Sequence, residues 1–172
     1  MAETLPTFLK RRAERSYRYL REQIEGLTAE EALTHYRADW PDHRWGIGQN
    51  GSIAGIVYHV ATWKQLTLPV FAPGGRTLTR EEFDVNAAPA PDDWAGITAW
   101  LEQIGDTWGR TLAALPDPAF DETRLWEGHS LPLSSFVVEM LEHDIQHAAQ
   151  IEYLRQALVL APVHMPDLRN RP

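Results

Sequence analysis

The feature that most constrains the fold is a set of four long segments in which apolar residues recur every three or four positions. They are residues 5–27, 52–66, 92–115 and 132–159. This spacing places the apolar side chains of each segment on one face of an α-helix. We find no convincing run with the two-residue alternation of a β-strand. The pattern predicts an all-α fold, namely a four-helix bundle.

Residues with known capping preferences indicate where these helices begin. Thr28 and Glu31 predict a capping box before a short helical stretch at residues 29–37, and Ser52 is placed to cap the second long helix. Pro132 suits the first turn of the last helix.

Two connecting segments show no helical period. Residues 67–91 contain Pro and Gly and are too long for a tight hairpin between helices, so we expect them to cross over between helices that lie parallel. Residues 116–130 are predicted to be irregular, and the Pro-rich tail from about residue 161 is expected to be loose.

Length and charge narrow the class of protein. A chain of 172 residues suits one domain, spanning residues 1–172. Its net charge of −8 argues against nucleic acid or an anionic membrane as the main partner. No apolar run approaches the roughly 20 residues that span a bilayer, and the N-terminus has no signal-peptide core, so a cytoplasmic location is expected. With no cysteine, the chain has no disulfide, thiolate metal site or cysteine nucleophile.

The last helix carries titratable residues where a core face requires apolar ones. His143 and His147 are four residues apart and point the same way. On a helical wheel, His147 lies about 20° and His143 about 60° from the centre of the apolar stripe at Met140. A buried imidazole needs a partner, and a divalent metal is one candidate. His59 lies at the margin of the buried stripe on the second helix and can complete a three-histidine set if the two helices are neighbours.

Other interpretations of these residues remain open at this stage. Both histidines of the last helix could instead bond to side chains of neighbouring helices. A two-metal carboxylate site is disfavoured, because Asp144 and His147 form the only approximation to a Glu-x-x-His pair. Asp144 is expected either to bond a ligand imidazole or to pair with an arginine of another helix.

Several aromatic and histidine side chains lie in the irregular segments. Trp45, Trp126 and His129 are expected to border the site, where they either line a pocket or cover the core. His129 is placed outside the set of metal ligands. The remaining histidines have polar or Pro-rich surroundings and are predicted to be solvated: His35, His43 and His164.

The stretch HDIQHAAQIEYLRQ resembles the last-helix motif of the DinB/YfiT-like superfamily, in which H-x-x-x-H is followed by Gln, an apolar residue and usually Leu-Arg. The matching positions are His143, His147, Gln150, Ile151, Leu154 and Arg155. A second family signature, a histidine after Ser-Ile on the second helix, is supplied by SIAGIVYH as His59. The resemblance covers most of the chain, including the long second crossover.

The resemblance implies a four-helix bundle with an up-down-down-up arrangement, often paired as a homodimer. It also implies that His59, His143 and His147 hold a divalent metal, with zinc or nickel among the candidates. Some members of the family are thiol-S-transferases or isomerases that use bacillithiol or mycothiol. No thiol-binding motif of this sequence matches closely enough to be carried over.

Three neutral imidazoles leave at least one metal coordination position open, which is typical of a catalytic site. Such a metal can activate water for hydrolysis of a small-molecule substrate, or hold a substrate thiol as thiolate. The sequence therefore favours a metal-dependent thiol-S-transferase or a metal-hydroxide hydrolase. The rival hypothesis is a non-enzymatic stress-response protein in which the metal is structural or sensory.

Overall fold

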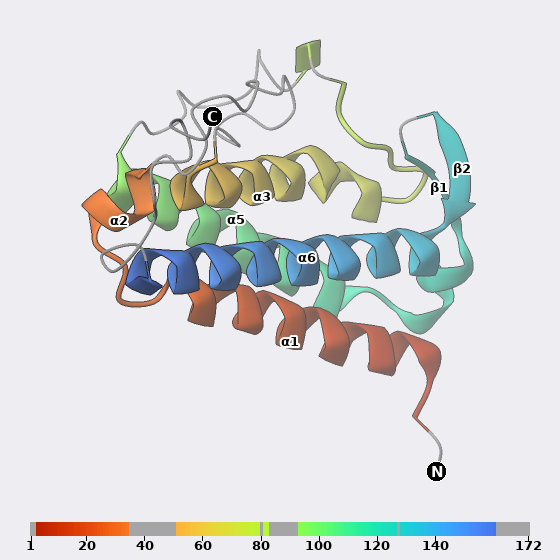
Figure 1. Ribbon diagram of the computed structural model, residues 1–172. Helices are drawn as coiled ribbons and strands as arrows, with labels where there is room; N and C mark the ends of the chain where they lie inside the picture. The colour runs from red at the N-terminus through yellow and green to blue at the C-terminus, as the bar shows by residue number, and fades with distance from the viewer. Residues whose placement is uncertain (1–2, 35–50, 80, 83–92, 127, 161–172) are drawn as a thin grey trace, which may run out of the picture.

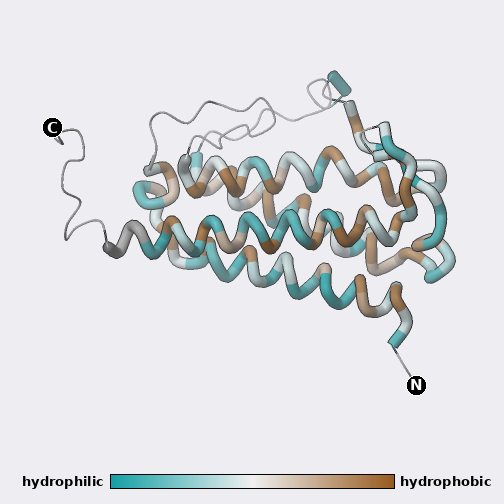
Figure 2. Tube along the Cα trace, turned by 45° about the vertical axis from the view of Figure 1, so that its right-hand side comes forward, coloured by the Kyte–Doolittle hydropathy of each residue, from teal (hydrophilic) through white to brown (hydrophobic). Residues whose placement is uncertain are grey.

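Four long helices lie side by side as a bundle in the computed structural model (Figure 1). The structure describes residues 3–34, 51–79, 81–82, 93–126 and 128–160, with side chains up to residue 156. The long helices are α1 (Leu5–Ile24), α3 (Ile53–Thr67), α5 (Trp94–Ala114) and α6 (Leu133–Leu160). The short elements are α2 (Ala29–Leu33) and the 3-10 helices η1 (Leu68–Phe71) and η2 (Asp117–Asp121). The predicted four-helix bundle is confirmed, and apolar and polar residues alternate along each long helix (Figure 2).

Cross-helix hydrogen bonds give the relative direction of α1 and α6. The Tyr19 hydroxyl donates to the Glu152 carboxylate at 2.6 Å, and further along both helices the Arg155 guanidinium donates to the Gln23 carbonyl at 2.7 Å. Both residue numbers rise together, so α1 and α6 are parallel, as Figure 1 shows.

The helix α5 runs the opposite way to α1. The Lys10 ammonium donates to the Leu115 carbonyl at 2.6 Å, whereas the Trp94 indole donates to the Leu27 carbonyl at 3.2 Å. Figure 1 shows α3 running alongside α5 in the same direction. The chain therefore crosses the length of the bundle between the end of α3 and the start of α5.

The predicted caps are present. Thr28 accepts from the Glu31 backbone N–H while the Glu31 carboxylate accepts from the Thr28 N–H, so the capping box at α2 is complete. The Ser52 hydroxyl accepts from the Gly55 N–H at 3.0 Å and caps α3. These bonds satisfy donors that a helix start leaves without an intrahelical partner.

One prediction was wrong, because the segment at residues 116–130 is not wholly irregular. It contains an antiparallel hairpin of β1 (Thr123–Trp126) and β2 (His129–Pro132), in which Trp126 faces His129. The inward position of β1 is taken by Arg124, which is 3% exposed and donates to the Val70 carbonyl at 2.9 Å. A charged residue on the buried side hid the two-residue alternation that identifies a strand.

Helix α3 occupies the centre of the core. Of its 15 residues, 13 are buried, so the helix is enclosed on nearly all sides rather than along one stripe. One of the buried residues is Lys64, which is 1% exposed. The sequence pattern assigns Lys64 to a polar face of the helix. Because its ammonium is buried instead, neighbouring residues must provide a counter-charge or hydrogen-bond acceptors.

Two glycines one turn apart on α5 differ in what surrounds them. A Cβ added at Gly105 would lie 2.2 Å from the ring of Tyr17, whose hydroxyl donates to the Leu101 carbonyl at 3.0 Å. A Cβ added at Gly109 would meet no atom of the described residues within 4 Å. Close approach of α1 thus explains the first glycine and leaves the second without a packing role.

We expect alanine at these two positions to change stability in opposite directions. Gly105→Ala should lower the free energy of unfolding by about 1–3 kcal/mol, because the ring of Tyr17 must move. Gly109→Ala should raise it by up to about 1 kcal/mol, because alanine favours the helix and nothing obstructs it. Urea unfolding of both variants beside the parent chain measures the difference. A Gly105→Ala variant as stable as Gly109→Ala would contradict the packing described here.

Candidate metal centre

Three histidines from two helices meet inside the bundle. Helix α3 supplies His59, and α6 supplies His143 and His147 from successive turns. The ring centroids are 5.1 Å apart for His59 and His143, 4.8 Å for His59 and His147, and 4.4 Å for the pair on α6. His147 is 5% and His59 is 8% exposed, and His143 is half-buried. The structure therefore brings together all three residues that the sequence singled out.

The ring nitrogens converge closely enough to bind a single ion. One ligand nitrogen from each histidine lies within 4.8 Å of the other two, and the Nε2 atoms of His59 and His143 are 3.1 Å apart. Two nitrogens bound tetrahedrally to one zinc ion at about 2.0–2.1 Å would be about 3.3–3.4 Å apart. The group needs only small side-chain movements to reach that geometry.

Gln150 fixes the orientation of the His147 ring. The Nδ1 atom of His147 lies 2.8 Å from the Gln150 side-chain oxygen, which can only accept. Nδ1 therefore carries the proton, and the lone pair of Nε2 is left available. A hydrogen bond of this kind commonly sets the tautomer of a metal-binding histidine.

Burial keeps the imidazoles on α6 neutral. It lowers the pKa of His143 to about 2, with further contributions from His147, His59 and Lys64. Burial also lowers the pKa of His147, although the Gln150 hydrogen bond and Asp144 act in the opposite direction. Neutral imidazole is the form that binds a metal. The Nδ1 atom of His143 is buried and has no hydrogen-bond partner among the described residues.

Asp144, which follows His143 on α6, forms a buried ion pair with Lys64 of α3. The Lys64 ammonium donates to Oδ2 of Asp144 at 2.8 Å, and the two side chains are 1% and 4% exposed. The two expected roles of Asp144 were a bond to an imidazole or a pair with an arginine. Its partner is instead a lysine of α3. Burial raises the pKa of Asp144, and the Lys64 charge opposes that shift.

Comparison with known proteins agrees with this arrangement. The family model of the DinB superfamily matches residues 12–151, which is most of the chain. This protein belongs to the DinB superfamily. No curated protein matches the chain.

A solved structure similar to this DinB-superfamily protein is YfiT from Bacillus subtilis, described as a probable metal-dependent hydrolase with an unusual four-helix bundle topology. The two chains are 16% identical, with a TM-score of 0.65, over 92% of this chain and 90% of YfiT. At that identity the likeness establishes the fold. No helix in the described ranges of this DinB-superfamily chain is long and apolar enough to cross a membrane.

A small cavity opens onto the histidine cluster of this DinB-superfamily protein at His143. It has a volume of about 210 Å³, and its walls include Trp63 and Trp126. Two exposed carboxylates, Glu139 and Glu142, also line it. Trp126 thus has both roles considered from the sequence, since it lines the cavity and its ring also packs against the core at Phe136, 5.1 Å away. Trp63 likewise lines the cavity and packs against the core.

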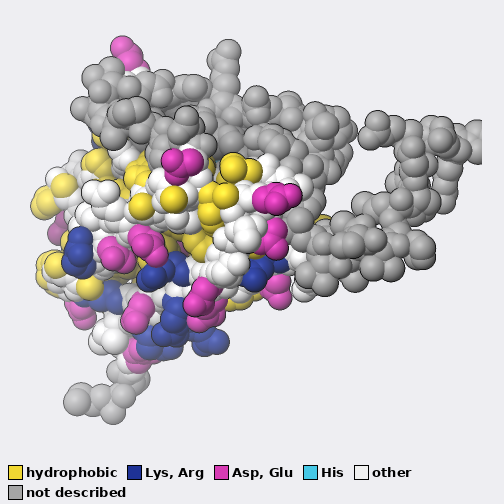
Figure 3. All heavy atoms as spheres, turned by 90° about the vertical axis from the view of Figure 1, so that its left-hand side faces the viewer, with side chains coloured by type: hydrophobic (Ala, Val, Ile, Leu, Met, Phe, Trp, Pro, Cys, Tyr) yellow, Lys and Arg dark blue, Asp and Glu magenta, His cyan; other side chains and the backbone are white. Residues whose placement is uncertain are grey.

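The other sequence candidates are not part of the histidine cluster or fall outside the described residues. His129 is exposed on β2 and is not among the clustered histidines. His35, His43, Trp45 and His164 fall outside the described residues. On the face shown in Figure 3, acidic and basic side chains intermix.

Acid should destabilise the metal-free protein through His143. Because its pKa is lower in the folded state than the unfolded value of about 6.5, the folded chain binds fewer protons at mildly acidic pH. Stability present above pH 6.5 is therefore lost as the pH falls. Below pH 6.5, we expect the free energy of unfolding of His143→Gln to fall by about 1.4 kcal/mol less per pH unit than that of the parent chain. Urea unfolding at pH 7, 6 and 5 with chelator measures both slopes, and equal slopes would contradict the shift.

Proposed function

We propose that this protein is a divalent-metal-dependent enzyme of the hydrolase type, with His59, His143 and His147 as the metal ligands. The observation that supports this most directly is the convergence of three ring nitrogens within 4.8 Å inside the core. The Nε2 atoms of His59 and His143 lie 3.1 Å apart, a distance that fits an N–H···N hydrogen bond in the metal-free chain and is close to the separation of two nitrogens bound to one ion.

The donor set also bears on the metal. Imidazole nitrogens suit zinc, nickel, copper and iron, whereas magnesium and calcium prefer oxygen ligands. Zinc or nickel is therefore our proposal for the ion. Three protein ligands leave a coordination position open, the arrangement found in catalytic zinc sites. A bound ion would supply Lewis acidity that activates water or a thiol.

Residues of the chain supply the remaining requirements of the site. Gln150 holds the His147 ring, and burial lowers the pKa of His143 and His147 so that both imidazoles stay neutral. The indoles of Trp63 and Trp126 limit the space beside His143, so a substrate bound there would displace water from the open side. Glu139 and Glu142 at the same cavity are available for polar contacts with that substrate.

A thiol-S-transferase is the second candidate. Trp63, Trp126 and Met140 give the cavity an apolar lining, which suits a sulfur nucleophile better than a strongly hydrated one. The proposed co-substrate is a low-molecular-weight thiol such as bacillithiol or mycothiol. Both candidates use the same three histidines, so variants of the ligands test the site and the choice of substrate separates the reactions.

Metal content tests the ligand assignment. We expect purified protein loaded with zinc or nickel to retain about one ion per chain after dialysis. His147→Ala should lose most of that ion, because it removes the imidazole that Gln150 orients. His129→Ala is the matched control, since that histidine is exposed and apart from the cluster. Equal metal content in the parent chain and His147→Ala would refute the assignment.

Turnover by the same three proteins separates the two reactions. An activated ester tests hydrolysis, and a chlorinated nitroarene with a panel of thiols tests transfer. We expect the parent chain and His129→Ala to be active only with metal and His147→Ala to be at background. Activity that needs the thiol would favour the transferase, and activity without thiol would favour the hydrolase. No metal-dependent turnover of either substrate class would favour a non-enzymatic role.

Removal of the metal should leave the fold intact, because the four helices bury an extensive core of their own. A metal concentration a thousandfold above Kd raises the free energy of unfolding by about 4 kcal/mol by mass action, which corresponds to about 8–16 °C in melting temperature. We expect chelated protein to keep its helical circular dichroism at 25 °C and to melt cooperatively at the lower temperature. Loss of the helical signal at neutral pH would favour a structural role for the metal.

A further inference from the structure

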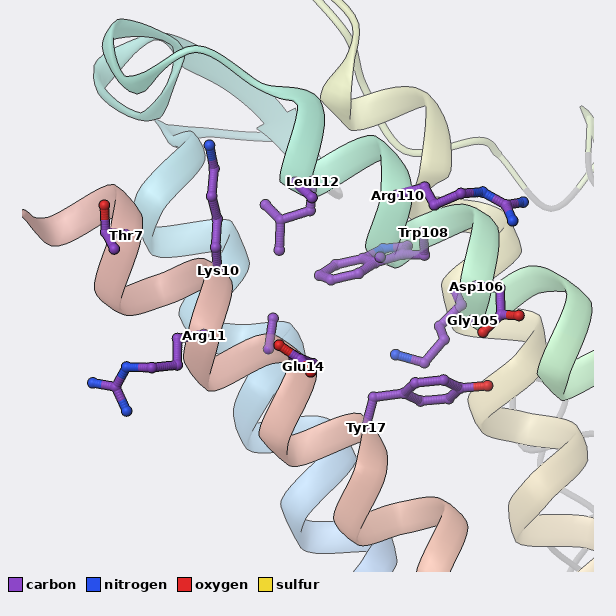
Figure 4. A pocket seen from close by; sticks show the side chains of 14 residues that line it. Thr7, Lys10, Arg11, Glu14, Tyr17, Gly105, Asp106, Trp108, Arg110 and Leu112 are labelled. Carbon is purple, nitrogen blue, oxygen red and sulfur yellow. The ribbon is translucent and has the colours of Figure 1, made fainter.

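A larger cavity lies on the other side of the bundle, between α1 and α5. It has a volume of about 670 Å³, within the range of about 300–1,000 Å³ typical of small-molecule sites. Figure 4 shows Tyr17, Trp108 and Leu112 facing this space, while Arg11 and Arg110 extend away from it. None of the three clustered histidines lines it. The cavity is therefore separate from the proposed metal site.

The wall formed by α5 is kept open by a glycine with no packing role. Gly109 lines the cavity at an exposed position of the helix, and a Cβ there would meet nothing within 4 Å. Glycine inside a helix is less stable than alanine. At Gly105 the ring of Tyr17 accounts for this loss of stability, whereas at Gly109 no described atom does, and the glycine leaves open space where it lines the cavity.

The lining of the cavity includes a buried hydrogen-bond donor. The Lys64 ammonium lines it and lies 5.0 Å from the ring centre of Tyr17 and 4.9 Å from that of Trp108. Of its three N–H groups, one hydrogen bond to a described residue is observed, to Asp144. The two rings give the ammonium cation–π contacts, and no oxygen acceptor for its other N–H groups is observed among the described residues. Since Lys64 is only 1% exposed, a single acceptor atom fits there better than a two-oxygen carboxylate.

The charges around the cavity balance. Its four basic groups are offset by two lining carboxylates and by two further carboxylates that pair with Lys64 and Arg11 at 2.8 Å each. The basic groups are Lys10, Arg11, Lys64 and Arg110, and the acidic ones are Glu3, Glu14, Asp106 and Asp144. An anion placed beside Lys64 would also face Asp144, and a cation would face Lys64 itself. Burying either charge without a counter-charge is unfavourable.

We propose that the cavity between α1 and α5 binds an uncharged aromatic molecule that carries a single hydrogen-bond-accepting oxygen, such as an aryl ketone. Its rings lie against Trp108 and Leu112 in the space that Gly109 leaves open. Its oxygen accepts from the Lys64 ammonium. Binding there requires neither the proposed metal nor a catalytic role for that metal.

Four naphthalene probes that differ in one substituent test the chemical class. They are 1-acetylnaphthalene, 1-methylnaphthalene, 1-naphthoate and 1-naphthylmethylammonium, measured by equilibrium dialysis against the full chain at pH 7. We expect the ketone to bind about tenfold or more tighter than the methyl compound, as expected for a hydrogen bond to a charged donor. Both charged probes should bind more weakly than the ketone. Tighter binding of either ion, equal binding of all four, or no binding of any probe would overturn the proposal.

A variant that fills the cavity tests the location. Gly109→Leu should weaken binding of 1-acetylnaphthalene at least tenfold, since the added side chain projects into the space between the helices. Ala99→Leu adds the same side chain to an exposed position of α5 that does not line the cavity, and its binding should equal that of the parent chain. Circular dichroism confirms that both variants fold, and Gly109→Ala, with the smaller obstruction, should show an intermediate loss. Unchanged binding by Gly109→Leu would place the ligand elsewhere.

Discussion

The buried ion pair of Lys64 and Asp144 is the interaction on which the interior arrangement depends. Transfer of two charges from water into a core is costly, and their mutual attraction offsets that cost only when the contact is close. Loss of one partner alone typically costs about 3–5 kcal/mol, because the other charge stays buried. The pair thus holds α3 and α6 at one relative position, and at that position His59 meets His143 and His147.

The same enclosure explains the chemistry available to the histidines. Because α3 is buried on nearly all sides, its polar groups need partners within the protein, and the threonine hydroxyls find them in carbonyls of the preceding turn. On the facing helix α6, burial likewise holds the imidazoles of His143 and His147 neutral by lowering the pKa of each. The low polarity of the interior makes burial of polar groups unfavourable. It also disfavours imidazolium, so the ring nitrogens keep lone pairs that can bind a cation.

The ion pair also lies between the two cavities of functional interest. Lys64 lines the larger cavity between α1 and α5, and Asp144 sits on α6 between the two histidines of that helix. The smaller cavity, beside Trp63 and His143, is lined by residues of α3, α6 and β1. The ion pair of Lys64 and Asp144 therefore contacts the candidate ligand site and supports the candidate metal site. The two sites differ chemically because different helices line them.

The sequence by itself determined the helices, the caps at Thr28 and Ser52, and the inward direction of His147, because helical periodicity and capping are local. It also supplied the three histidines as a set, conditional on neighbouring helices. Only the tertiary structure decided that Lys64 is buried, that Asp144 pairs with it, and that Gly105 accommodates Tyr17. Periodicity determines which side of a helix a residue occupies. The partner of that residue depends on the rotation and axial position of neighbouring helices that are distant in sequence. The hairpin at β1 and β2 was missed for the same reason, since the burial of Arg124 depends on a carbonyl that lies 54 residues away along the chain.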